Sequence, residues 1–95
     1  RSLRTELPPE VEIAAVAAAG EAMFRARGYS IREKSITRTE ACLIGNTPKD
    51  GWLDQTVFRA YVTPGGTGMT IRIDPWGDEA ASRTLMDDVL ARLGR

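Results

Sequence analysis

The residues Gln55–Asp74, QTVFRAYVTPGGTGMTIRID, decide the fold because they predict two strands joined by a tight turn. The segment 64–68, PGGTG, is glycine-rich turn sequence, and apolar residues alternate with others on both sides of it. Alternation with period two is typical of a strand with one buried face. The predicted inward face consists of Phe58, Ala60, Val62, Met69, Ile71 and Ile73.

Helical periodicity flanks this hairpin at both ends of the chain. Pro8-Pro9 predicts the start of an alanine-rich helix that ends at Gly28, and Asp78 predicts the start of a second helix that ends at Gly94. Each helix carries apolar residues at spacings of three and four, so each has one buried stripe. Between the first helix and the hairpin, segments 29–33 and 40–46 predict two further strands. Both faces of segment 40–46 are apolar, so the pattern leaves its inward face open.

The predicted order is therefore helix, four strands, helix. Short connections favour antiparallel neighbours, and two amphipathic helices need one apolar sheet face to cover. We predict an α+β two-layer sandwich, with a four-stranded antiparallel sheet and two helices on one face. A chain of 95 residues suits one domain. Residues 1–8 are predicted to be a flexible lead-in, and residues 9–95 to form the single α+β domain.

The composition excludes several classes of function. Thirteen basic and thirteen acidic residues give zero formal net charge, which disfavours a nucleic-acid binder. There is no histidine, so the commonest general base and zinc ligand is missing. The single cysteine, Cys42, lies in an apolar strand and is expected to be a small buried thiol. We therefore predict no catalytic, cofactor-binding or metal-binding residues, and no cofactor.

The face of the hairpin opposite Phe58 carries the more informative residues. Arg59 and Tyr61 share it, and Arg72 on the neighbouring strand is predicted to join them, with Trp52 at the rim. Tyrosine and arginine on an open sheet are typical of a protein-binding surface. The plain alternative is a solvated outer face, with the two tryptophans closing the ends of the core.

Several short motifs resemble a group of small bacterial lipoproteins that are known only as domains of unknown function. The resemblance runs from Val57 through the Pro-Gly-Gly-Thr hairpin to Ile71-Arg72-Ile73 and includes a leading helix that ends in Arg27-Gly28-Tyr29. It continues through the segments 77–82, GDEAAS, and 85–87, LMD. It implies export to the periplasm or cell envelope, with membrane attachment only through a lipidated cysteine upstream of Arg1. It brings no catalytic residues.

The predicted function is that of a noncatalytic cell-envelope domain that binds a protein partner or a second copy of itself. Trp52, Arg59, Tyr61 and Arg72 are its predicted contact residues. Two alternatives stay open. One is a carrier of a small apolar ligand held in a cavity between helices and sheet, and the other is an enzyme of unknown class. Without the resemblance, a cytoplasmic location stays open.

Overall fold

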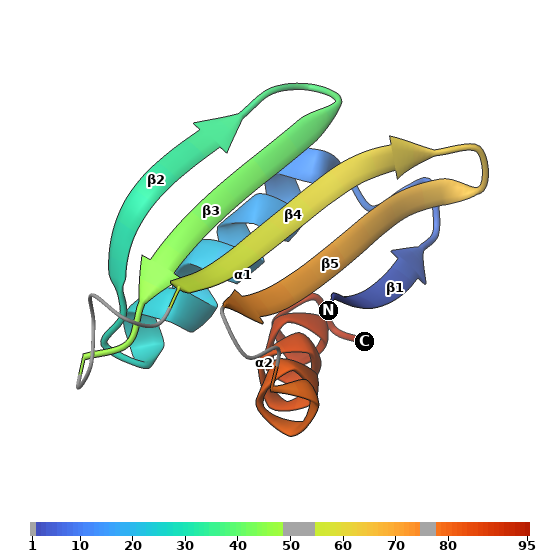
Figure 1. The fold of residues 1–95 in the computed structure, drawn as a ribbon. Helices are drawn as coiled ribbons and strands as arrows, with labels where there is room; N and C mark the ends of the chain where they lie inside the picture. Colours follow the sequence, from blue (N-terminus) through green and yellow to red (C-terminus); the bar gives the residue numbers. More distant parts are fainter. Residues whose placement is uncertain (1, 49–54, 75–77) are drawn as a thin grey trace.

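The structure, a computed structural model, describes residues 2–48, 55–74 and 78–95 (Figure 1). Two helices and five strands make up this part of the chain. In chain order the elements are β1 (Leu3–Leu7), α1 (Ile13–Ala26), β2 (Ser30–Ile36), β3 (Glu40–Asn46), β4 (Gln55–Thr63), β5 (Gly66–Asp74) and α2 (Glu79–Arg92).

The strands form one antiparallel sheet in the order β1-β5-β4-β3-β2. The prediction of an α+β fold is confirmed, but the prediction of four strands is wrong. The fifth strand is β1, which lies within the segment predicted to be a flexible lead-in. It pairs with β5 along its whole length, from Leu3 opposite Ile71 to Leu7 opposite Thr67. Residues 3–7 are too few to predict a strand by their own alternation. They form one because they pair with the open edge of the β4–β5 hairpin.

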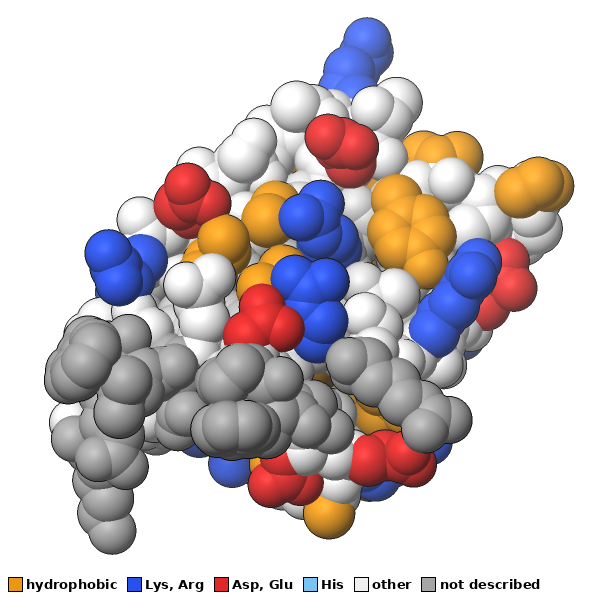
Figure 2. Space-filling model, in the orientation of Figure 1, with side chains coloured by type: hydrophobic (Ala, Val, Ile, Leu, Met, Phe, Trp, Pro, Cys, Tyr) orange, Lys and Arg blue, Asp and Glu red, His pale blue; other side chains and the backbone are white. Residues whose placement is uncertain are grey.

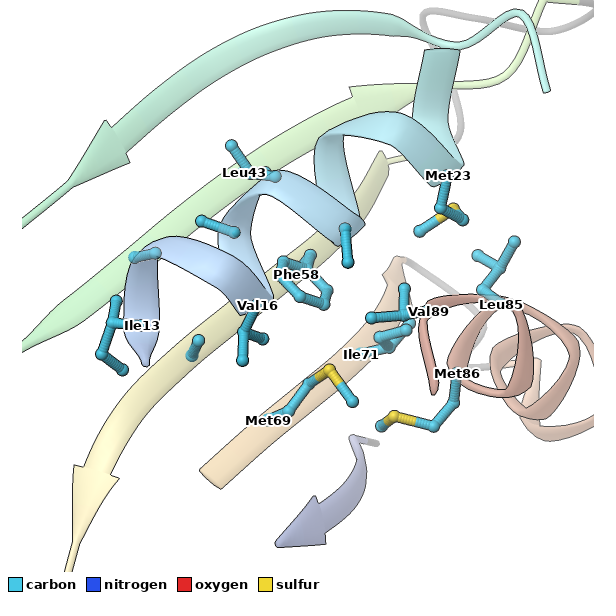
Figure 3. Packing of buried hydrophobic residues seen from close by; sticks show 14 of the residues in the cluster. Ile13, Val16, Met23, Leu43, Phe58, Met69, Ile71, Leu85, Met86 and Val89 are labelled. Atoms are coloured by element: carbon cyan, nitrogen blue, oxygen red, sulfur yellow. The ribbon is translucent and has the colours of Figure 1, made fainter. Parts of the chain in front are cut away.

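Both helices pack against the same side of the sheet and contribute to one hydrophobic cluster (Figure 3). From α1 the cluster contains Val16 and Met23, and from α2 it contains Met86 and Val89. The predicted inward face of the hairpin is confirmed at Phe58, Ala60, Met69 and Ile71, which are fully buried. Burying a large apolar side chain contributes about 1.5–3 kcal/mol, so this shared core is the main source of stability.

The structure shows which face of β3 points inward, which the sequence leaves open. Ala41 and Leu43 are buried in the core under the helices. Cys42 and Ile44 point to the opposite side and are half-buried. The expectation of a buried thiol at Cys42 is therefore wrong. The reason is register, because a strand with apolar residues on both faces still places every second residue outside.

Two ion pairs join the helices to their neighbours. Glu21 of α1 lies 3.0 Å from Lys34 of the edge strand β2. Asp88 of α2 lies 3.0 Å from Arg27, just after the end of α1. Hydrogen bonds from Arg25 and Lys34 hold the pKa of Glu21 below its ordinary value. These contacts help to keep α1 and α2 together on one side of the sheet.

Candidate functional site

The side of the sheet that faces away from the helices carries no covering element among the described residues, and we call it the outer face (Figure 2). Figure 2 shows hydrophobic side chains on this face with Lys and Arg side chains among them. The strand registers assign to it Arg4, Glu6, Glu40, Cys42, Ile44, Val57, Arg59, Tyr61, Thr70, Arg72 and Asp74.

Three of the four predicted contact residues come together on the outer face. Arg59 and Tyr61 are two positions apart on β4, so they point to the same side. Arg72 lies opposite Val57 on the adjacent β5, which places it on that side as well. The fourth predicted contact, Trp52, lies outside the described residues, as does Trp76.

An apolar patch lies beside these residues. Val57 and Ile44 are directly opposite each other on β4 and β3, and Cys42 lies two residues before Ile44 on the same side. Val57 is only 4% exposed although it is not part of the core cluster under the helices. The outer face is therefore not uniformly charged, because the half-buried side chains of Cys42 and Ile44 lie among its charged residues.

Tyr61 is held in place by its neighbours. Gly68 lies opposite it on β5, and a Cβ atom at Gly68 would be 2.5 Å from the Cε2 atom of Tyr61. The ring can lie over this position only because glycine leaves it empty. The Arg4 guanidinium carbon lies 5.7 Å from the centroid of the same ring, within range of a cation–π contact. Arg4 is a site residue that sequence reasoning missed, because it lies on β1.

The charges on the outer face are unevenly paired. Arg72 forms an ion pair with Asp74, with 2.9 Å between Nε and Oδ1. The guanidinium of Arg59 has no ion pair or hydrogen bond with any residue that the structure describes. The same holds for the carboxylate of Glu40 within the described part of the chain. Arg59 is exposed at the middle of the sheet, with Cys42 and Thr70 directly opposite it on the two neighbouring strands.

No family model and no curated protein matches this chain in sequence. The resemblance to envelope lipoproteins therefore stays a prediction, and the geometry of the outer face is what bears on its role.

The described residues offer little for other kinds of site. Across residues 2–48, 55–74 and 78–95, no three His, Cys, Asp or Glu side chains lie close enough together to hold a metal ion. In the same residues, neither 14-residue helix is long and apolar enough to cross a membrane.

The two edges of the sheet are poor places for strand addition. The edge strand β2 exposes charged side chains and has a register irregularity between Ile31 and Glu33. The other edge strand, β1, has only five residues. Bulges, charges and short edges all oppose pairing with another chain. The outer face is thus better suited to contact a partner than either edge.

Proposed function

We propose that this domain is a noncatalytic association module of the cell envelope, in which the outer face binds a second copy of the chain. The envelope location rests on the lipoprotein resemblance alone. The observation that supports the association is the unpaired Arg59 beside an apolar patch, with the unpaired Glu40 on the same face.

The unpaired charges favour a particular kind of partner. Covering Arg59 removes water from its guanidinium, which is unfavourable unless the partner supplies an anionic group. A second copy supplies one in Glu40. In a two-fold symmetric contact the pair occurs twice, Arg59 to Glu40 and Glu40 to Arg59. The zero formal net charge of the chain means that two copies do not repel each other strongly.

Charge exchange at these two positions tests the proposal. Sedimentation velocity over a concentration series should show a dimer for the unmodified chain. Arg59→Glu and Glu40→Arg should each raise the dimer dissociation constant by at least about tenfold, because each brings two like charges together. The double variant should recover most of the loss. Arg83→Glu is the matched control, since Arg83 is an exposed arginine of α2 and its substitution gives the same net charge as Arg59→Glu.

Two results would contradict the proposal. One is a monomer at every concentration, and the other is a dimer that Arg59→Glu weakens no more than Arg83→Glu does. Circular dichroism of each variant shows whether the fold is kept, so that a lost dimer is not confused with a lost fold.

A ligand carrier is the second candidate, and one observation favours it. The structure has a hollow of about 710 Å³. This hollow opens at the surface where α1 begins. The ligand-carrier alternative drawn from the sequence expects a cavity in the interior, between the helices and the sheet.

A further inference from the structure

A groove lies at the end of the sheet where α1 begins. Figure 1 shows the β2–β3 and β4–β5 turns at this end. The groove has a volume of about 710 Å³, and its walls come from the start of α1 and from both turns. This volume falls within the range of about 300–1,000 Å³ that is usual for small-molecule sites. The groove lies at the helix side of the sheet, so it is separate from the outer face.

The apolar wall of the groove is unusually exposed. Ile36 is 42% exposed and Val62 is 58% exposed. In the described part of the chain, these two are the exposed large hydrophobic residues. Both line the groove. Ile36 lies opposite the core residue Ala41, and Val62 lies on the same side of β4 as Ala60. They point toward the helix layer, but α1 begins only at Ile13 and leaves them uncovered.

The walls of the groove are held by hydrogen bonds. The Thr67 hydroxyl donates to the carbonyl oxygen of Val11 at 2.8 Å, which joins the β4–β5 turn to the start of α1. The Thr37 hydroxyl donates to the carbonyl oxygen of Glu40 at 3.0 Å and accepts from its amide at 3.1 Å, which closes the β2–β3 turn. A Cβ atom at Gly66, where φ is 153°, would be 2.2 Å from the carbonyl oxygen of Leu7. The groove is therefore preformed, which reduces the entropy lost on binding.

The charged groups of the groove are Arg38, Glu12 and the positive end of the α1 helix dipole. Arg38 lies on its rim, is exposed, and has no ion pair or hydrogen bond with the described residues. The first turn of α1 contains no acidic residue, and the side chain of its N-cap residue, Glu12, makes no capping hydrogen bond. The start of this helix carries the positive end of the helix dipole, and no Glu12 carboxylate is bonded to its amides. Glu12 is the one acidic side chain in the lining and opposes an anion.

We propose that this groove binds an amphiphilic anion, namely an aliphatic chain that ends in a carboxylate. The chain packs against Ile36 and Val62, and the carboxylate pairs with the Arg38 guanidinium. Burial of apolar surface supplies most of the affinity. The charged group fixes the direction in which the ligand lies. This site is independent of the proposed self-association.

Isothermal titration with dodecanoate, below the concentration at which it forms micelles, tests the site. Dodecanoate should bind saturably at one site, and dodecyltrimethylammonium, which has the same chain and a cationic head, should bind more weakly. Arg38→Gln should weaken dodecanoate binding by about fivefold, the worth of an exposed ion pair. Glu12→Gln should strengthen it, because it removes the opposing charge. Val62→Asp should abolish it.

Arg83→Gln is the matched control and should leave dodecanoate binding unchanged. The proposal is overturned if dodecanoate does not bind saturably, or if the cationic amphiphile binds equally well. It is also overturned if Arg38→Gln and Arg83→Gln have the same effect. Amide chemical shifts of Ile36 and Val62 supply a second readout and should move on titration. A failure of self-association in sedimentation leaves this site untouched, so the two proposals fail separately.

Discussion

At the scale of single residues, the close approach of α1 to the sheet depends on Gly20. A Cβ atom at this position would be 2.6 Å from the Cε2 atom of Phe58. Phe58 itself is fully buried, so its ring has little room to move. In the sequence Gly20 occupies a position in the apolar stripe of the helix, where glycine lowers helix propensity. The structure shows why glycine fits there.

Gly20→Ala should therefore lower the free energy of unfolding. Alanine improves helix propensity by about 1 kcal/mol, but the added methyl group forces the Phe58 ring aside, which costs about 1–3 kcal/mol in a packed core. Urea denaturation gives the net change. Phe58→Leu should cost less in the Gly20→Ala background than in the unmodified chain. A Gly20→Ala variant more stable than the unmodified protein would contradict the close packing.

Phe58 and Val62 offer a matched comparison on one face of one strand. Phe58→Ala should cost about 3–5 kcal/mol, because it opens a cavity in the core. Val62→Ala should change the stability by less than about 0.5 kcal/mol, because the side chain is largely in solvent. Thermal or chemical unfolding checks both values. Equal losses of stability would contradict the burial of Phe58 and the exposure of Val62.

At the scale of elements, the ion pair between Asp88 and Arg27 adds to the hydrophobic packing of α1 and α2. Partial burial raises the pKa of Asp88, but hydrogen bonds from Arg92 and Arg27 outweigh it, so the net pKa lies below its ordinary value of 3.8. The folded protein therefore binds this proton less readily than the unfolded chain does. The pair stabilises the fold above the unfolded pKa, and this contribution is lost as the pH falls through the folded pKa.

Asp88→Asn should reduce stability by about 0.5–1 kcal/mol at neutral pH, the usual range for a partly exposed pair. The difference from the unmodified protein should shrink as the pH falls below 3.8. Urea denaturation at a series of pH values measures this. Asp87→Asn is the control, because the adjacent Asp87 is exposed and has no ion pair with the described residues. A loss that does not depend on pH would exclude the electrostatic account.

The sequence predicts most elements of this fold because most have a local signal. Asp78 caps α2 as its position suggests, accepting a hydrogen bond from the Ala81 amide at 2.9 Å. The segment Leu3–Leu7 does alternate, but its strand depends on pairing with β5, which no local pattern reveals. Likewise β2 extends to Ile36 through polar residues, since pairing with β3 outweighs their weak strand propensity.

At the scale of the whole molecule, both helices cover one side of the sheet, and no other element of the described residues covers the outer face. That Arg59, Tyr61 and Arg72 share this face follows from period-two alternation and hairpin register, so the sequence predicts it. The contact of Arg4 with Tyr61 could not be predicted, because it requires β1. The apolar patch at Cys42 also required the register of β3. We propose that two copies of the chain associate through this face.

The chain's only cysteine provides the most direct test of that claim. Cys42 is half-buried on the outer face, directly opposite Arg59. Its rate of reaction with a maleimide can be measured as the protein concentration rises. If two copies meet through this face, the rate should fall with the fraction of dimer found by sedimentation, and in Arg59→Glu the rate should no longer depend on protein concentration. A constant rate across a range in which the protein dimerises would place the contact elsewhere and contradict the account.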